Sequence, residues 1–222
     1  MDDSTVELIR DSLGPLLSGM VKGTVPLTAV SFVLGLVVAL VVALMRLSPL
    51  WPVSAIARFY VSVIRGTPLL VQLFIIFYGL PSLGATIDPW PSACLAFTLN
   101  VGGYASEIIR AAIVSVPRGQ WEAAQTVGMN HPTALRRIIL PQATRVAVPP
   151  LSNTLISLVK DTSLASSILV TETFRKAQEL AAPTYEFFTL YMVAAAYYWV
   201  VCLVLSFAQT RFESRLDRYV AS

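Results

Sequence analysis

The residues of this chain best suited to chemistry are charged and polar side chains that interrupt long apolar stretches. Lys160 and Asp161 stand side by side within the apolar stretch 145–170, and Thr162 and Ser163 follow them. An ionisable group inside a membrane span is costly, so its presence indicates a function. Neighbouring side chains on a helix point about 100° apart, so Lys160 and Asp161 need not neutralise each other. They could meet an α-carboxylate and an α-amino group; a structural ion pair, or a charge at a subunit interface, is the alternative.

The apolar stretch 91–115 also contains polar side chains, of which Glu107 and Arg110 lie one helical turn apart. These two could pair with each other, or Arg110 could reach the lipid head groups with its long side chain. Asn100 and Tyr104 lie on roughly the same helix face as Glu107. Asn100 could hydrogen-bond a ligand or a neighbouring helix, and both interpretations stay open.

A third polar group interrupts the apolar stretch 58–80, where Arg65 is followed by Gly66, Thr67 and Pro68. Pro68 removes a helix hydrogen bond, and the Thr67 hydroxyl can satisfy the freed carbonyl. Many transporters place a site at such a broken helix; a helix that starts here at the cytoplasmic head groups is the alternative. Gln72 lies one turn further in and could face the same pathway.

Catalytic constellations are missing from the sequence. The only histidine is His131, and there is no Gly-x-Ser-x-Gly, metal-ligand cluster or pair of catalytic carboxylates. There is no Gly-x4-Gly-Lys-Ser/Thr phosphate loop either, so we expect no ATP hydrolysis by this chain. The two cysteines, Cys94 and Cys202, lie in apolar segments and are predicted to be thiols, with a disulfide as the alternative. The sequence therefore predicts a chain that is not an enzyme and binds no metal.

The composition indicates which elements must position these residues. Of the 222 residues 55% are apolar and only 13% are charged, about half of the quarter usual for a soluble domain. Lipid must therefore be the solvent for much of the surface. A spanning helix needs about 20 mostly apolar residues, and five stretches qualify. We predict an all-α membrane protein with one transmembrane domain, 1–222, whose spans lie at about 21–45, 58–80, 91–115, 145–170 and 187–210.

Loop charge predicts how the five spans are oriented, since Lys and Arg stay on the cytoplasmic side. The loop 46–58, the long loop 118–144 and the C-terminal tail are all basic, whereas the loop 80–91 contains no Lys or Arg. The tail contributes Arg211, Arg215 and Arg218. The N-terminus is thus expected on the periplasmic side and the C-terminus in the cytoplasm. The net charge of +3 is too small to indicate a nucleic-acid partner.

The cytoplasmic loop 118–144 has the pattern of two short helices with a sharp turn between them. Residues 121–127 are good helix formers, Gly128 suits the position after a helix end, and Pro132 suits a new first turn. Apolar residues at i, i+3 and i+4 from Leu135 give the second helix one apolar face, and Pro141 is expected to end it. From periodicity alone, a helix pair lying on the membrane surface is an equal alternative.

The spacing in this loop resembles the EAA motif of ABC importer permeases. The matching positions are Glu122, Ala123, Ala124, Gly128, Ile138, Leu140 and Pro141. The resemblance implies a coupling helix that docks in a groove of a separate ATPase subunit. Small alanines allow the close packing that helix-in-groove recognition requires, and Glu122 suits the positive end of the helix dipole.

The resemblance extends over nearly the whole chain. Segments 65–70 and 158–164 look like the polar amino-acid permeases of type I ABC importers, and segments 45–49, 119–122 and 149–153 look most like bacterial L-cystine permeases. Permeases for arginine or histidine, or for glutamine or glutamate, stay as alternatives. An ion-coupled secondary carrier is a further alternative, but it would not need the docking loop.

The same resemblance implies a multi-pass protein of the bacterial inner membrane that works by alternating access. Its implied partners are two ATPase subunits, a periplasmic amino-acid-binding protein and a second permease subunit, either the same chain or a related one. ATP and Mg would be bound by the ATPase, and this chain would bind no cofactor itself.

Overall fold

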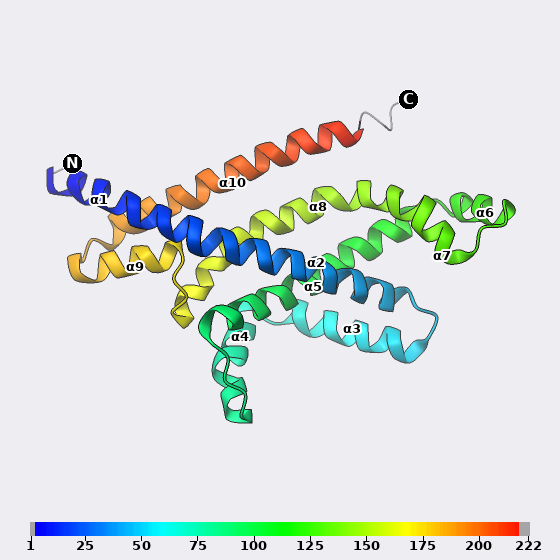
Figure 1. Ribbon diagram of the computed structural model, residues 1–222, viewed down its shortest axis with the longest axis horizontal. Helices are drawn as coiled ribbons and strands as arrows, with labels where there is room; N and C mark the ends of the chain where they lie inside the picture. Colours follow the sequence, from blue (N-terminus) through cyan, green and yellow to red (C-terminus); the bar gives the residue numbers. More distant parts are fainter. Residues whose placement is uncertain (1–2, 218–222) are drawn as a thin grey trace.

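The computed structural model describes residues 3–217, and in this range the chain is helical and contains no strand. Figure 1 shows an elongated bundle of long helices. The helices are α1 (Asp3–Gly19), α2 (Val25–Leu47), α3 (Trp51–Gly66), α4 (Leu69–Phe74), α5 (Pro89–Ser115), α6 (Arg118–Thr126), α7 (His131–Ala134), α8 (Leu140–Asp161), α9 (Thr173–Thr184) and α10 (Phe187–Asp217). Arg218 of the predicted basic tail lies outside the described residues.

Among residues 3–217, two helices are long and apolar enough to cross a membrane, Thr5–Leu47 and Phe187–Ser214, and two bent helix pairs would raise the number to four. The bent pairs are Trp51–Gly66 with Leu69–Leu83, and His131–Ile168 with Thr173–Thr184. The prediction of an all-helical membrane protein is confirmed. Five spans stay a prediction, because α5 is long enough but carries the polar residues of the stretch 91–115.

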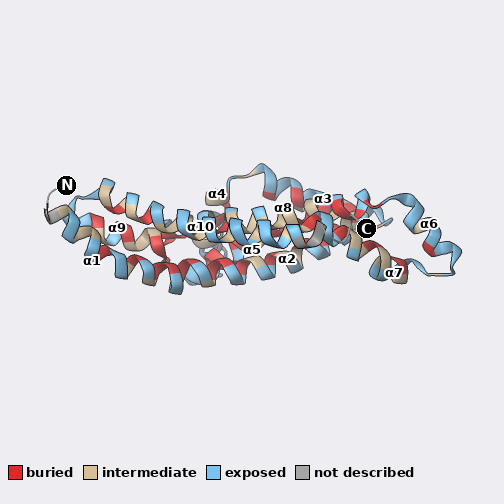
Figure 2. Ribbon diagram, turned by 90° about the horizontal axis from the view of Figure 1, so that it is seen from above, coloured by how far each residue is buried: buried red, intermediate tan, exposed pale blue. Residues whose placement is uncertain are grey.

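Helix α5 lies at the centre of the bundle, and α2 packs along it. Phe97, Val101 and Ala105 of α5 are buried in the main apolar core. Gly35 of α2 lets the two backbones approach, because a Cβ there would come within 2.5 Å of Val101. Figure 2 shows buried residues on the inner sides of the long helices and exposed residues over most of α6. The outer side of α2 exposes Val30, Val33, Leu34, Val37 and Leu40, as expected for a lipid-facing surface.

The first helix begins much earlier than position 21. A π-helical turn, Met20–Thr24, joins α1 to α2 without a break, so one helix of 43 residues runs over Thr5–Leu47. The sequence hides α1 because acidic residues such as Asp11 interrupt its apolar pattern. In the structure Asp11 is exposed, whereas Leu16 is fully buried in a cluster with residues of α9 and α10. The N-terminal segment is therefore an amphipathic extension of the first span.

The predicted break at Arg65–Pro68 is confirmed. Helix α3 ends at Gly66, Thr67 and Pro68 are extended, and the chain turns by 107° into α4. The Thr67 hydroxyl donates to the Val63 carbonyl at 2.8 Å, because the proline leaves carbonyls of the last α3 turn without their usual helical donors. In Figure 1, α4 leads away from the bundle to one side.

The expectation that Pro141 ends a helix is wrong, because a π-helical turn, Leu135–Ile139, leads from α7 directly into α8. The hydrogen-bond register changes at that turn, and Pro141 then stands in the first turn of α8, where a missing N–H is tolerated. The α-helix ends at Asp161 and continues as a 3-10 helix over Thr162–Ile168, so the helical segment ends close to the predicted 170. The helix α9 that follows was not expected.

A buried carboxylate begins α9. Glu172 is fully buried, and it accepts hydrogen bonds from the backbone N–H groups of Phe174 at 2.8 Å and Arg175 at 2.6 Å. The hydroxyl of Tyr198 on α10 donates to the same carboxylate. The carboxylate thus caps the helix and ties it to α10, which satisfies a charge that would be costly to bury alone.

The π-helical turn in the first helix packs against this cap. The hydroxyls of Thr24 and Thr173 lie 2.9 Å apart, and both side chains are fully buried. Gly23 lacks a side chain at the point where the backbone before α9 comes closest. Figure 1 shows α1, α9 and the start of α10 at one end of the molecule, with α6, α7 and the α2–α3 turn at the other.

Candidate functional site

The α3–α4 bend, α5 and α8 enclose a cavity of about 410 Å³ whose wall is both polar and apolar. The bend contributes Thr67, Pro68 and Leu69; α5 contributes Asn100, Val101 and Tyr104; and α8 contributes Asn153, Thr154, Ser157, Leu158 and Asp161. The cavity therefore lies where the broken helix meets the two helices that carry the polar residues. Amides, hydroxyls and one carboxylate can hydrogen-bond a small polar molecule there, and the volume falls within the roughly 300–1,000 Å³ usual for ligand pockets.

Four residues singled out in the sequence line this cavity: Thr67, Asn100, Tyr104 and Asp161. The sequence reasoning missed Asn153, Thr154 and Ser157. Their spacing was the available signal, since positions 153, 157 and 161 are four residues apart and share one helix face. Polar residues repeated on one face of an apolar helix would have predicted that α8 turns this face toward a cavity.

Lys160 does not lie beside Asp161 on the cavity wall. Its side chain is exposed, whereas Asp161 is half-buried and lines the cavity. Thr162 is fully buried and donates to the Val159 carbonyl at 2.7 Å, and Ser163 donates to the Lys160 carbonyl at 2.7 Å. These two hydroxyls thus close the end of α8, and the structure leaves Asp161 as the charged group on the wall.

Gln72 braces the bend instead of lining the cavity. Its side chain is buried, and its Nε2 lies 2.8 Å from the Ile64 carbonyl and 2.9 Å from the Thr67 hydroxyl. Asn100 in turn donates to Gln72 Oε1 at 3.1 Å. The amide thus replaces helix hydrogen bonds that Pro68 prevents and connects the bend to α5. One side of Asn100 is held by this brace while the residue lines the cavity.

Glu107 is surrounded by three arginines from three helices. The pairing with Arg110 is present, at 3.3 Å from Nε to Oε1, as the sequence spacing suggested. Arg46 from the end of α2 donates to the same carboxylate, and Arg65 Nη1 from the end of α3 lies 3.9 Å from Oε2. The guanidinium of Arg65 also lies over the Tyr104 ring, 5.5 Å from its centroid. Contacts between helices of this kind leave no signal in a single sequence.

The segment between α5 and α8 has the predicted helix–turn–helix form. Gly128 ends the turn after α6 with φ of +78°, and its N–H donates to the Gln125 carbonyl at 2.9 Å. The Asn130 side chain caps α7 by accepting from the Thr133 N–H at 3.0 Å. The rings of Trp121 and His131 stack at 4.7 Å and hold the two helices together.

The motif positions in this segment divide between surface and interior. Glu122, Ala123 and Pro141 are exposed, as is Gly128. Ala124 is fully buried, and Ile138 and Leu140 are half-buried beside the buried Ile139. Glu122, Ala123 and Gly128 thus lie on the outer surface of α6 and the turn after it, and Pro141 is exposed at the start of α8, while the buried positions fix the segment to the rest of the chain.

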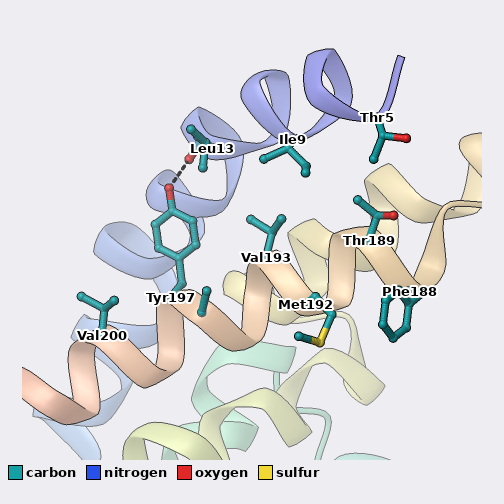
Figure 3. Close-up of a pocket in the computed structure, with 10 residues that line it drawn as sticks. Thr5, Ile9, Leu13, Phe188, Thr189, Met192, Val193, Tyr197 and Val200 are labelled. Carbon is teal, nitrogen blue, oxygen red and sulfur yellow. Dashed lines mark hydrogen bonds between the residues drawn. The ribbon is translucent and has the colours of Figure 1, made fainter. Parts of the chain in front are cut away.

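A second cavity, of about 640 Å³, lies between α1 and α10, and Figure 3 shows its lining. No charged side chain contributes to that lining, and the hydroxyl of Tyr197 is engaged with the Leu13 carbonyl at 2.8 Å. The cavity is therefore unsuited to a charged ligand. Within residues 3–217, no three His, Cys, Asp or Glu side chains gather as metal ligands, and Cys94 and Cys202 are free thiols.

Comparison with known proteins places these features in context. The family described as binding-protein-dependent transport system inner membrane component matches residues 31–218. The L-cystine transport system permease protein TcyB of Bacillus subtilis (strain 168) is 58% identical over 216 residues, 97% of this chain and 92% of that protein. The arginine transport system permease protein ArtQ of the same organism is 37% identical over 194 residues, 87% of this chain and 89% of that protein.

The fold is also similar to a solved structure, that of an amino acid ABC transporter crystallised with histidines. The two chains superpose with a TM-score of 0.86 at 38% sequence identity, and the match covers 91% of this chain and 94% of the other.

Proposed function

Because the chain belongs to the binding-protein-dependent transport system inner membrane components, we propose that its substrate is L-cystine. The chain is a permease of an ABC importer for polar amino acids, an inner membrane component and a non-catalytic subunit that works with an ATPase and a binding protein. The single observation that favours cystine is the 58% identity to TcyB over 97% of the chain. The identity to the arginine permease ArtQ is much lower, at 37%.

Uptake by the complete assembly tests the substrate. The permease, its ATPase and its binding protein are reconstituted in proteoliposomes, and ATP-driven uptake of labelled cystine is measured against unlabelled cystine, arginine, glutamine and histidine. We expect only cystine to compete at low concentration. If arginine, glutamine or histidine competes as strongly as cystine, the cystine assignment is wrong, although the chain is still an amino-acid permease.

We further propose that the cavity of about 410 Å³ is the translocation site. Asp161 would meet an ammonium group of the amino acid, and Asn100, Asn153 and Ser157 would hydrogen-bond its other polar groups. The support is their convergence on one cavity beside a broken helix, the position at which transporters commonly bind their substrates. A carboxylate in a low-dielectric wall attracts a cation more strongly than it would in water.

Asp161→Asn is expected to lower cystine uptake at least tenfold, because the amide is nearly isosteric but carries no charge for the ammonium group. The measurement is the initial rate of ATP-driven uptake, with co-purification of the ATPase as evidence of assembly. Lys160→Gln is the matched control: it removes the adjacent charge, but Lys160 is exposed and does not line the cavity. Equal uptake by Asp161→Asn and Lys160→Gln would contradict the proposal that Asp161 binds the ammonium group in this cavity.

The helix pair α6–α7 is proposed as the docking element for the ATPase. It exposes Glu122, Ala123 and Gly128 at the end of the molecule that also contains the α2–α3 turn. Small exposed residues on a short helix suit close packing into a groove. Placing this end in the cytoplasm agrees with the positions of Arg46, Arg58 and Arg118, and puts the N-terminus in the periplasm with five spans between.

With the cavity as the translocation site and α6–α7 as the docking element, the proposed mechanism is alternating access of the cavity to the two sides of the membrane. Closure of the ATPase pair would move the docking elements of two permease subunits, and the helices would switch the cavity between the two sides of the membrane. We propose that the second permease subunit is a second copy of this chain. Co-expression of two differently tagged copies tests this, because both tags must be present in one purified, active assembly if the permease is a homodimer.

A further inference from the structure

The arginine cluster around Glu107 has more positive than negative charge. Arg46, Arg65 and Arg110 face the single carboxylate of Glu107, and no other carboxylate among the described residues pairs with them. Arg46 and Arg110 are at most 30% exposed, so these like charges are partly withdrawn from water and repel one another more strongly than charges in water would. The three guanidinium groups and one carboxylate leave two positive charges without a partner, so the cluster can accept an anion.

Arg65 is the member of this cluster that is free to do so. Arg46 and Arg110 donate hydrogen bonds to the Glu107 carboxylate, whereas Arg65 stays 3.9 Å away, beyond hydrogen-bond distance. The Arg65 side chain is also the most accessible of the three, 47% exposed against 18% for Arg46 and 30% for Arg110. An anion could therefore bind Arg65 without breaking the Arg46–Glu107 pair that joins α2 to α5, or the Arg110–Glu107 pair within α5.

The Arg65 guanidinium lies at the edge of the proposed translocation cavity. It is held over the Tyr104 ring, and Tyr104 lines that cavity. Two residues after Arg65, Thr67 lines the cavity as well. Glu107 follows Tyr104 by three residues on α5, so the cluster borders the cavity on the side toward α6. Arg65 is thus in contact with a side chain of the cavity wall.

We propose that Arg65 binds the α-carboxylate of the transported amino acid at this edge of the cavity; this inference rests on the proposed translocation site. Neither Arg65 nor Lys160 lines the cavity itself, but the Arg65 guanidinium lies over the ring of the lining residue Tyr104, whereas Lys160 is exposed and forms no ion pair among the described residues. A guanidinium matches a carboxylate with two parallel hydrogen bonds, which gives orientation as well as attraction. Arg65 would then select for ligands with a carboxylate, while Asp161 selects for the ammonium group.

Direct binding to the purified permease–ATPase complex, without the binding protein, tests this inference. Omitting the binding protein removes that protein's own selectivity from the measurement. The ligand pair is L-cystine and cystamine, which share the disulfide and both amino groups but differ in the carboxylates. In Arg65→Gln, we expect cystine affinity to fall about tenfold or more, the effect of losing one charge-assisted pair, while cystamine affinity stays unchanged.

Two further variants separate a ligand contact from a structural effect. Arg58→Gln removes another α3 arginine, which is exposed and, among the residues that the structure describes, donates to the Ser54 carbonyl alone. This variant should bind both ligands like the wild type. Arg65→Lys keeps the charge and should restore part of the cystine affinity. Equal losses for cystine and cystamine in Arg65→Gln, or no loss for either, would overturn the role of Arg65.

The outcome for Arg65 can be distinguished from the outcome for the substrate. If the wild-type complex binds arginine and not cystine, the cystine assignment fails, and the comparison is repeated with arginine and its decarboxylated form, agmatine. A selective loss of arginine affinity in Arg65→Gln would then still support the carboxylate contact. Parallel loss of arginine and agmatine would contradict it.

Discussion

Gly128→Val is expected to reduce ATP-driven uptake at least tenfold, whereas Gly119→Val nine positions earlier should leave it close to wild type. Both glycines belong to the docking segment, and a Cβ at either would meet nothing within 4 Å. They differ in backbone conformation, because Gly128 has φ of +78°. A left-handed backbone costs a residue with a Cβ roughly 1–2 kcal/mol, and β-branching adds to this.

That penalty acts on the turn that sets the angle between α6 and α7. Each 1.4 kcal/mol changes an equilibrium tenfold, so a valine would shift the equilibrium about tenfold or more toward other turns, which move the exposed Glu122 surface away from the ATPase. The measurements are uptake and co-purification of the ATPase. Gly128→Asn is an informative third variant, since asparagine tolerates the left-handed region and should retain more uptake than valine. Wild-type uptake and ATPase co-purification in Gly128→Val would contradict the docking proposal.

Gly23→Ala is expected to destabilise the protein by about 3 kcal/mol or more, the upper end of overpacking effects. A Cβ at this position would lie 2.3 Å from the Thr171 carbonyl oxygen and 2.7 Å from the Glu172 Cα. Both are backbone atoms, so no side chain can rotate away. The segment cannot retreat easily either, since the Glu172 carboxylate is fixed by α9 and by Tyr198.

Thermal unfolding of the purified permease in detergent measures the effect of Gly23→Ala. Lys22→Ala is the matched control, because it introduces alanine at the adjacent position, where the side chain is exposed. This variant should unfold at the same temperature as the wild type. Gly19→Ala should be intermediate, since its Cβ would come within 3.0 Å of the Glu172 backbone. If Gly23→Ala unfolds at the same temperature as Lys22→Ala, the close packing of the first helix on the α9 cap is wrong.

Local chemistry explains which parts of the fold could be predicted. Pro68 has no N–H group for a helix hydrogen bond, whatever the tertiary structure around it, so the sequence predicts the break. The turn at Gly128 followed from the same kind of local rule. The prediction that a helix ends at Pro141 failed because a π-helical turn just before it changes the hydrogen-bond register. The residue types at 135–139 do not predict such a turn.

Tertiary contacts explain what could not be predicted. Helices α1 and α9 have mixed polar and apolar sequences that do not by themselves predict where a helix is buried. Their apolar residues are buried because Leu16, Ala177 and Ala194 pack together in one cluster. The exposure of Lys160 and the meeting of Arg46 with Glu107 depend on how separate helices are rotated. Asp161, Asn100 and Thr67 were each suspected singly, but their convergence on one cavity required the fold.

The unbroken first helix has a mechanical consequence. Its 43 residues extend for about 65 Å at 1.5 Å per residue, roughly twice the thickness of the hydrocarbon core. It is therefore a stiff lever. One end adjoins α3 at the end of the molecule that contains α6, and the other packs against α9. By the same helix length, a rotation of about 5° about one end displaces the opposite end by about 6 Å. A small movement at one end is thus magnified at the other, and the π-helical turn at Met20–Thr24 is the place where the helix could bend.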